Sequence, residues 1–414
     1  MMHGIIARDL KIQSLNKVQF VLKLISTCNL RCTYCYWFFK EDNTWKESSV
    51  SVKAETIEWI IIAIQDAIDE LDLKEVDIIF HGGEPLMLKK HVFEQHCNLF
   101  REKIQKKCIL NFKIQTNAVL VDEEWIDIFS RQNIAVGVSL DGDKDANDEY
   151  RIDIHGNGSY EKTVDGIKLL MDASSSNKII KPALISVINP KFNYEKLLNH
   201  FYQLGFETIN FLMPNYCHDD IPNDFNMEGI TKALKDIFNV WITQDNPLQK
   251  PIIFIEKDIN FFQRVNFKNY RYSENTRYNA IIAVTTDGLM SVNDNLMCTD
   301  WRKMQPSPSI KDTSLKAYLN SLTYITLDEE EGIIPRECSE CEYKNICKGG
   351  ELPHRYSRKK GFDNRSIYCV PLKIYYQYLS RFLVANGYPT NELNHLLAQN
   401  PTAKLKNYER IIEI

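Results

Sequence analysis

Clustered cysteines are the residues of this chain whose type and spacing point most directly to chemistry. One cluster, near the N-terminus, comprises Cys28, Cys32 and Cys35. Another, near the C-terminus, comprises Cys338, Cys341 and Cys347, with Cys369 some way beyond it. In a reducing compartment such clusters indicate metal or redox chemistry rather than disulfides.

The spacing of the first cluster favours iron–sulfur chemistry over zinc. A structural zinc site needs four ligands, and CNLRCTYC supplies three, with no further Cys or His nearby. Three thiolates on a tight loop can instead hold three irons of a four-iron cluster. The fourth iron then stays open to an exogenous ligand, such as one that carries an amine and a carboxylate. The alternative is that these are buried cysteines without a metal.

The elements that must position these thiols alternate along the chain. Strands are predicted at 17–25, 76–80, 112–115, 134–140, 179–188 and 208–213. Helices are predicted at 52–71, 89–106, 122–131, 160–172, 193–204 and 228–241. Such alternation predicts an α/β fold with a parallel sheet and outer helices. Because no GxGxxG follows the first strand, we expect a partial (β/α)6 TIM-like barrel rather than a dinucleotide-binding fold.

Polar and glycine-rich segments follow four of the predicted strands. These segments are 28–35, 81–85, 116–117 and 139–141. In a parallel barrel the loops after the strands share one face, and that face carries the chemistry. We therefore expect the four segments to converge in space.

Bulk composition restricts the class of protein. The chain has 414 residues, of which 44% are hydrophobic and 25% charged, and its net charge is −5. These values are typical of a globular protein and give no general attraction to nucleic acid or to an anionic membrane, so we expect neither as a partner. Because no apolar run is long enough to span a membrane and no signal-peptide pattern is present, we expect a cytoplasmic protein.

Changes of pattern along the chain predict four regions. We expect a barrel over 15–245, a connecting segment over 246–330, a cysteine-rich, metal-held module over 331–375 and a helical tail over 376–414. The spacing of the cysteines at 338, 341 and 347 suits either a zinc ribbon or an iron–sulfur cluster. Spacing alone leaves both open.

Two motifs of the barrel region resemble a known family. CNLRCTYCY at 28–36 resembles the CxxxCxxC-aromatic signature of the radical S-adenosylmethionine (SAM) enzymes, and HGGEP at 81–85 resembles their GGEP element. The resemblance implies that the three cysteines of the first cluster ligate a [4Fe–4S] cluster. The open iron would bind the methionyl amine and carboxylate of SAM, and one electron would split SAM into methionine and a 5′-deoxyadenosyl radical.

Further positions resemble the SAM contacts of this family. By resemblance they are Tyr36, Gly82, Gly83, Glu84, Thr116, Asn117, Ser139, Asp141 and Arg151. The GGEP residues would receive the methionyl amino group, and the tyrosine would lie near the adenine. The Thr-Asn pair would lie near the ribose or the substrate, the serine near the ribose and the arginine near the methionyl carboxylate, which its planar fork suits. Taken alone, each would equally suit a turn, a core aromatic or a surface charge.

The stretch CSECEYKNICKGGELPHRY resembles the SPASM domain, a C-terminal module with auxiliary iron–sulfur clusters in radical SAM enzymes that act on peptides and proteins. The resemblance implies one auxiliary [4Fe–4S] cluster, with Cys338, Cys341, Cys347 and Cys369 as its ligands. Glu351 stands where the usual pattern has a cysteine of a second, inner cluster, and Cys298 is a candidate remnant ligand. We therefore expect the inner cluster to be absent, or incomplete with Glu351 as an oxygen ligand.

The resemblance also implies a reaction class, hydrogen abstraction from a peptide or protein substrate, with an electron donor such as flavodoxin or ferredoxin. The main prediction is a maturase of ribosomally made peptides that installs a crosslink or a related modification, with cyclophane-forming maturases as the expected subgroup. The alternative is an anaerobic sulfatase-maturating enzyme, which oxidises Ser or Cys to formylglycine. The missing inner-cluster cysteines favour the former. A non-catalytic iron–sulfur or zinc protein is a third possibility.

The sequence assigns no catalytic base. Asp300 follows Cys298 by two residues, near where some relatives keep a carboxylate, but its register is off by one. Of the scattered cysteines, Cys97 and Cys108 are expected in the core, and Cys217 is expected in a loop at the barrel mouth.

Overall fold

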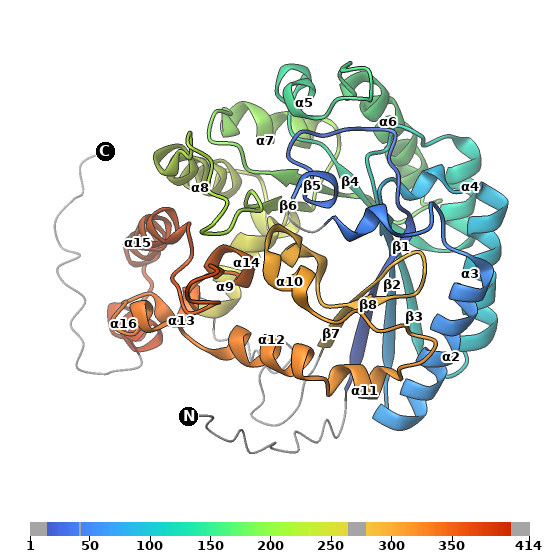
Figure 1. Ribbon diagram of the computed structural model, residues 1–414. Helices are drawn as coiled ribbons and strands as arrows, with labels where there is room; N and C mark the ends of the chain where they lie inside the picture. Colours follow the sequence, from blue (N-terminus) through green and yellow to red (C-terminus); the bar gives the residue numbers. More distant parts are fainter. Residues whose placement is uncertain (1–14, 41–42, 264–278, 399–414) are drawn as a thin grey trace, which may run out of the picture.

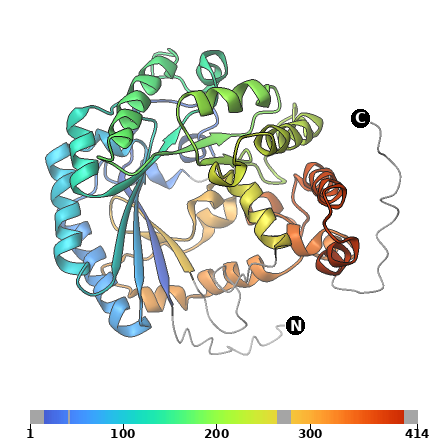
Figure 2. The same cartoon turned by 180° about the vertical axis from the view of Figure 1, so that it is seen from behind.

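The computed structural model describes residues 15–40, 43–263 and 279–398. Its centre is an eight-stranded sheet with the spatial order β6-β5-β4-β3-β2-β1-β7-β8. Strands β1 to β7 run parallel, and β8 pairs antiparallel with β7. The sheet curves and carries helices on its outer side, as Figure 1 and, from behind, Figure 2 show. The predicted α/β fold with a partial barrel is confirmed.

The predicted strands and helices all form. The strands are β1 (Lys17–Ile25), β2 (Glu75–Gly82), β3 (Ile109–Thr116), β4 (Ile134–Ser139), β5 (Ala183–Val187), β6 (Ile209–Leu212), β7 (Asn279–Val284) and β8 (Met290–Ser291). The outer helices are α2 (Ala54–Leu71), α3 (Lys90–Ile104), α4 (Glu123–Arg131), α6 (Tyr160–Ser175), α7 (Tyr194–Gln203) and α8 (Met227–Ile242). Side-chain caps fix several helix starts: Asp122 accepts from the backbone N–H of Trp125, and Asn193 accepts from that of Lys196.

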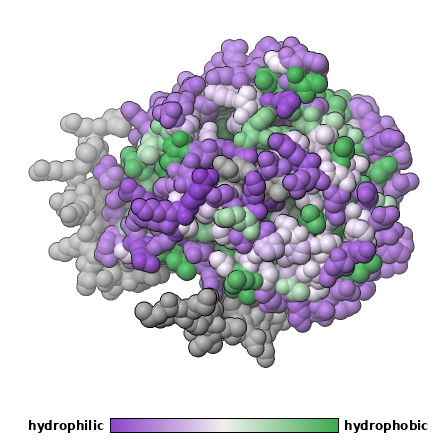
Figure 3. All heavy atoms as spheres, in the orientation of Figure 1, coloured by the Kyte–Doolittle hydropathy of each residue, from purple (hydrophilic) through white to green (hydrophobic). Residues whose placement is uncertain are grey.

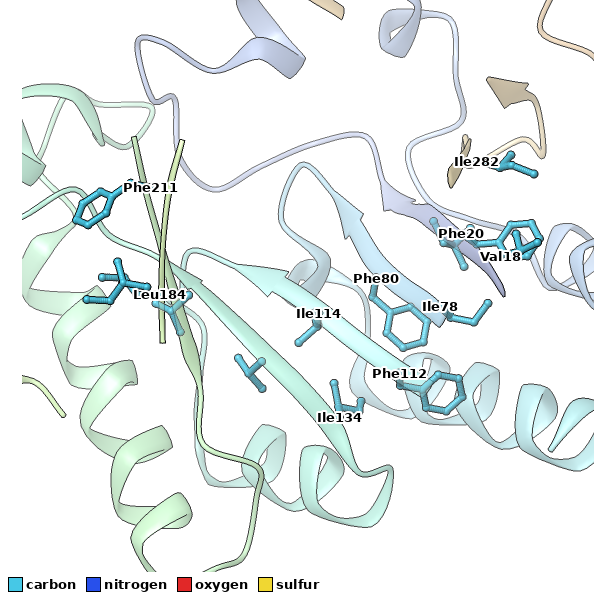
Figure 4. Packing of buried hydrophobic residues seen from close by; sticks show 14 of the residues in the cluster. Val18, Phe20, Ile78, Phe80, Phe112, Ile114, Ile134, Leu184, Phe211 and Ile282 are labelled. Atoms are coloured by element: carbon cyan, nitrogen blue, oxygen red, sulfur yellow. The ribbon is translucent and has the colours of Figure 1, made fainter. Parts of the chain in front are cut away.

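One face of each strand packs against the outer helices and forms the core. The ring centroids of Phe80 and Phe93 lie 4.8 Å apart, and those of Phe93 and Trp125 lie 5.2 Å apart. These three side chains are at most 1% exposed. Figure 4 shows alternate strand residues, such as Ile78, Phe80 and Phe112, gathered in this layer. The edge-to-face contacts add to the free energy gained by burying the rings.

The other face of β1, β2 and β3 is polar at the N-terminal ends of these strands. Lys17 of β1 lies 2.7 Å from Glu75 and 2.8 Å from Asp77 of β2, and Lys113 of β3 lies 2.7 Å from Asp77. Burial alone would raise the pKa of Asp77, but hydrogen bonds from Lys113, Lys17 and Asn111 lower it. The charges at this end of the barrel are therefore paired within the protein.

The segment expected to connect barrel and module contributes to the sheet itself. It contains α9 (Ile253–Phe262), β7, β8, the 3-10 helix η5 (Asp294–Cys298), α10 (Asp300–Met304), α11 (Leu315–Leu319) and α12 (Leu322–Gly332). Strand β7 pairs with β1 in parallel, with Val18 opposite Ala280 and Leu22 opposite Val284. The sheet thus continues beyond residue 245, while the domain limits themselves remain predictions.

The C-terminal elements follow α12 in the chain, and one of them packs against α8. They are η6 (Arg336–Cys338), α13 (Lys344–Cys347), α14 (Leu352–Arg355), α15 (Cys369–Ala385) and α16 (Thr390–Ala398). Helix α15 packs on α8, where the ring centroids of Phe238 and Phe382 are 5.0 Å apart and the Tyr378 hydroxyl donates to Asn239 at 2.6 Å (Figure 1). These contacts anchor α15 to the barrel, and the part of the predicted tail after residue 398 lies outside the described residues.

The described residues include no helix long and apolar enough to cross a membrane. The face shown in Figure 3 is mostly hydrophilic, and its hydrophobic residues lie in small separate patches. Scattered patches of this size are ordinary on a protein surface.

Candidate active site

The first cysteine cluster lies on the loop between β1 and the short helix α1 (Tyr36–Phe39). Backbone hydrogen bonds pin the loop from two sides. The N–H of Gly83 donates to Ile25 at 2.8 Å, and on the other side the N–H of Arg31 donates to Ile152 at 2.6 Å. Both bonds join the loop to segments that follow other strands, so the fold fixes the three thiols at the C-terminal end of the barrel.

The GGEP element requires its glycines because its backbone touches the cysteine loop. A Cβ on Gly82 would lie 2.3 Å from the Ile25 carbonyl oxygen, and Gly82 has a φ of +127°. A Cβ on Gly83 would lie 1.9 Å from the carbonyl oxygen of Thr27. Any side chain at either position would push the loop away, so this contact sets the position of Cys28 relative to β2.

Glu84 is the centre of a buried network that joins two strand ends. It is 1% exposed, and its carboxylate accepts from the Thr116 hydroxyl at 2.7 Å and from the Asn117 N–H at 2.8 Å. The Asn117 side chain donates to Asn29 of the cysteine loop at 2.8 Å. Burial raises the pKa of Glu84 to about 7, although these hydrogen bonds oppose the shift. The predicted GGEP and Thr-Asn positions are thus brought together beside the cysteine loop.

A second buried network holds the other side of the loop. Arg151, 8% exposed, donates to the Tyr34 hydroxyl at 2.8 Å and lies 3.8 Å from Asp141. Tyr34 also bonds to Asp141, whose other oxygen accepts from the Val187 N–H at 3.0 Å. Ser139, at the end of β4, accepts from Gln115 at 2.8 Å. The four predicted segments therefore converge, and their roles toward SAM remain predictions.

Inside the barrel lies a polar group with two members, Lys23 and Asp294, that the sequence analysis missed. The Tyr36 hydroxyl, predicted near the adenine, donates to Asp294 of η5 at 2.9 Å. Lys23 of β1 forms an ion pair with the same carboxylate and lies 3.2 Å from the Nδ1 atom of His81. Lys23 is 2% exposed and Asp294 is 7% exposed. Asp294, rather than Asp300, is the acidic residue of this region that reaches the cysteine loop.

Asp300 instead faces the C-terminal module. It accepts from the Tyr356 hydroxyl at 2.5 Å and from the Arg358 side chain at 2.5 Å. Its carboxylate therefore ties α10 to the segment after α14. This placement agrees with leaving Asp300 unassigned as a catalytic base.

The second cysteine cluster surrounds one cavity of about 20 Å³. The lining includes the thiols of Cys338, Cys341, Cys347 and Cys369. Its charged lining residues are Lys344, Arg365 and Lys373. Burial raises the pKa of Cys338 to about 11 and that of Cys347 to about 12, and the neighbouring thiols add to both shifts. The four predicted auxiliary-cluster ligands are thus brought together.

The positions considered for an inner cluster differ in environment. Glu351 is exposed and begins α14, without capping that helix. Cys298 is fully buried, and its thiol donates to the Asn295 carbonyl oxygen at 3.7 Å. Cys217, also buried, donates to the carbonyl oxygen of Cys298 at 3.6 Å. Both thiols are bonded to the backbone, and the absence of an inner cluster stays a prediction.

Residues 22–204 match the model of the Radical SAM superfamily. These residues form a radical SAM domain. Among curated relatives, a cysteine-type anaerobic sulfatase-maturating enzyme of Clostridium perfringens is 24% identical over 358 residues, which make up 85% of this chain and 93% of that relative. A serine-type enzyme of Bacteroides thetaiotaomicron is 35% identical over 145 residues, 35% of this chain and 34% of the relative.

Solved structures share the fold of the radical SAM domain and the elements after it. Native anSMEcpe with bound AdoMet and Cp18Cys peptide has a TM-score of 0.74 at 20% identity, covering 89% of this chain and 98% of that chain. Streptococcus suis SuiB bound to S-adenosylmethionine has a TM-score of 0.54 at 15% identity, covering 86% and 78%. With the sequence relatives, these findings make the chain a radical SAM enzyme related to the anaerobic sulfatase-maturating enzymes.

The thiols of the radical SAM domain fit the [4Fe–4S] cluster that this family uses. Burial raises the pKa of Cys28 to about 12, so three thiolates need a cationic centre beside them, which iron supplies. Within the described ranges, no three Cys, His, Asp or Glu side chains are grouped to bind one metal ion.

Proposed function

We propose that this radical SAM enzyme oxidises the side chain of a cysteine or serine in a peptide or protein substrate, the chemistry of sulfatase maturation. Within the structure, the observation that carries the proposal is the Asp294 carboxylate, buried in the barrel beside Tyr36 and the cysteine loop. The relatives that align with most of the chain are sulfatase-maturating enzymes, and they support this function over peptide crosslinking, the main prediction from sequence.

The cofactors would be held by residues from both ends of the chain. Cys28, Cys32 and Cys35 would hold the first cluster, and the four thiols around the second cavity would hold the auxiliary cluster. Glu84 and Arg151, buried and of opposite charge, would receive the amine and the carboxylate of SAM. When bound, these groups supply a 5′-deoxyadenosyl radical for hydrogen abstraction and an acceptor for one further electron.

The remaining step is the removal of one proton from the substrate, and a residue of the protein must perform it. When the Cβ atom of a cysteine or serine loses a hydrogen atom and an electron, its thiol or hydroxyl must also lose one proton. Serine then yields the aldehyde directly, and cysteine yields a thioaldehyde that water converts to the aldehyde with release of hydrogen sulfide. In this proposal Asp294 accepts the proton. Burial alone would raise its pKa, but the charge of Lys23, the His81 ring and hydrogen bonds from Lys23 and Tyr36 together lower it to about 2, so the carboxylate is ionised at neutral pH.

Anaerobically prepared holoenzyme tests this function with SAM, a chemical reductant and the Cp18Cys peptide, the peptide bound in the related anSMEcpe structure. We expect a product that has lost the cysteine thiol and reacts with a hydrazide probe for aldehydes. Asp294→Asn should abolish the aldehyde product. Cleavage of SAM to 5′-deoxyadenosine with an unmodified peptide, or an equal aldehyde yield from Asp294→Asn, would contradict the proposal.

Peptide crosslinking is a second candidate, and one observation favours it. An exposed glutamate, Glu351, stands where a further cysteine of the module is usual, so the module is poorer in thiols than the pattern it resembles. A crosslinking enzyme would give a product lighter by two hydrogens that does not react with the hydrazide probe. The same mass measurement therefore separates the two functions.

A further inference from the structure

The Lys23–Asp294 pair is an unusual feature of the barrel interior. Lys23 interrupts the apolar run of β1, and its side chain is 2% exposed. The ammonium contacts three groups: the Asp294 Oδ2 atom, the His81 Nδ1 atom at 3.2 Å, and the ring of Trp37, whose centroid lies 4.5 Å away. Burying such a pair costs desolvation free energy, and an apolar pair of the same volume is often at least as stable. Stability alone therefore does not explain the pair.

The contacts of Lys23 leave it no donor for a substrate. A lysine ammonium has three N–H donors, and two of them are directed at Asp294 and His81 while the third side faces the Trp37 ring. The Gly82 N–H also points at the His81 Nδ1 atom, at 2.8 Å. Because two donors converge on Nδ1, the His81 ring is neutral and carries its proton on Nε2. Any effect of Lys23 on a substrate must therefore pass through the groups that it contacts, such as Asp294 and His81.

The two oxygens of Asp294 are in different situations. Both the Lys23 ammonium and the Tyr36 hydroxyl bond to Oδ2. Among the described residues, no hydrogen bond falls on Oδ1. One oxygen is thus held by the protein, and the other is left to accept a proton from a ligand in the barrel.

We propose that Lys23 is the positioning residue of this site: it forms an ion pair with Asp294 Oδ2, keeps the buried carboxylate ionised and leaves Oδ1 to accept the substrate proton. The inference rests on the proposed function, because it needs Asp294 as the proton acceptor. The charged and titratable groups that face Asp294 are Lys23 from β1, His81 from β2 and Tyr36 from α1. Arg302 of α10 and Cys35 of the cysteine loop act in turn on Tyr36 and Lys23.

The pKa values agree with this geometry. Lys23 is the largest of the influences that oppose burial, so its removal would raise the pKa of Asp294. The pKa of His81 is lowered to about 4 by burial and by Lys23, so removal of Lys23 would also let the His81 pKa rise. A protonated His81 could then replace part of the lost charge. The test must therefore include His81.

The experiment measures aldehyde product per 5′-deoxyadenosine between pH 5.5 and 9 with holoenzyme and the Cp18Cys peptide. For Lys23→Met we expect this ratio to fall about tenfold at neutral pH and to recover with a half-maximal pH of about 8, whereas the wild-type ratio should not show this loss between pH 5.5 and 9. Lys23→Arg should restore the wild-type profile. Adding His81→Gln to Lys23→Met should deepen the loss at low pH.

Lys17→Met is the matched control. Lys17 lies on the same strand and the same inner face and also pairs with a buried carboxylate, Asp77, at 2.8 Å, but at the far end of the barrel. Lys17→Met should lower the thermal unfolding midpoint without shifting the pH profile of the ratio of aldehyde to 5′-deoxyadenosine. Lys23→Gln, which keeps a donor without the charge, serves if Lys23→Met does not fold. The double variant Lys23→Met/Asp294→Asn, which removes both charges, should regain the unfolding midpoint but give no aldehyde.

The outcomes separate this inference from the proposed function. If the profile of Lys23→Met coincides with wild type, or if Lys17→Met shifts it equally, Lys23 is not a positioning residue. If Asp294→Asn meanwhile loses the aldehyde, the proposed function still stands. If Asp294→Asn retains the wild-type ratio, Asp294 is not the proton acceptor and both ideas fail.

Discussion

The two cysteine clusters are built differently, and the difference separates two kinds of site. The first lies at the ends of parallel strands, held by backbone bonds from distant segments and flanked by buried groups of opposite charge, Glu84 and Arg151. The second lies on the short helices η6 and α13, the turn between them and the first residue of α15, around a small cavity whose charged lining residues are cations. The first arrangement suits an exchangeable zwitterionic ligand, and the second suits a closed cluster that only carries electrons.

Loss of a thiol from the first cluster should have the largest effect. Cys32→Ala leaves two thiols on the loop, too few to hold three irons with one iron open. We expect no detectable SAM cleavage and a loss of about four irons per chain, measured by 5′-deoxyadenosine formation and iron analysis. Wild-type SAM cleavage by this variant would contradict the assignment of the first cluster.

Loss of a thiol from the second cluster should reduce formation of the modified peptide much more than SAM cleavage. Cys341→Ala removes a thiol that lines the cavity of the second cluster, so SAM cleavage should continue at least in part while the modified peptide disappears. Both can be quantified in the same assay by chromatography and mass spectrometry. Equal and complete loss of cleavage in Cys32→Ala and Cys341→Ala would show that the two clusters do not have separate roles.

The pH dependence of SAM binding should report on Glu84. Its pKa, raised by burial to about 7, makes the carboxylate neutral below that pH, and a neutral carboxyl binds the methionyl ammonium more weakly. The KM for SAM should therefore rise about tenfold between pH 8 and pH 6. Glu84→Gln should raise the KM and flatten this dependence. A pH-independent KM in the wild type would argue against Glu84 as the amine receptor.

Glu351 should give the smallest effect. Because its side chain is exposed, Glu351→Ala should change the free energy of unfolding by no more than about 0.5 kcal/mol and leave the iron content unchanged. Thermal unfolding and iron analysis measure both. A loss of iron would instead identify Glu351 as a ligand of an inner cluster.

The strands and helices could be predicted from the local periodicity of the sequence. The convergence of the polar segments that follow the strands could be predicted as well. Glu84, Thr116 and Asn117 meet because each follows a parallel strand, and such ends share one edge. Asp294 could not be found this way, because it is separated from Lys23 by 271 residues and its local sequence resembles a turn. Only the pairing of β7 with β1 brings η5 over the barrel. The available signal was Lys23 itself, a charge within an apolar strand that requires a buried anion.

The most direct test of the central claim is electron paramagnetic resonance of the reduced holoenzyme before and after SAM is added. If the thiols at 28, 32 and 35 hold a cluster with one open iron, the signal of that cluster must change when SAM binds. The Cys341→Ala variant should show the same change, and Cys32→Ala should show none. A wild-type spectrum that is unaltered by saturating SAM would contradict the account.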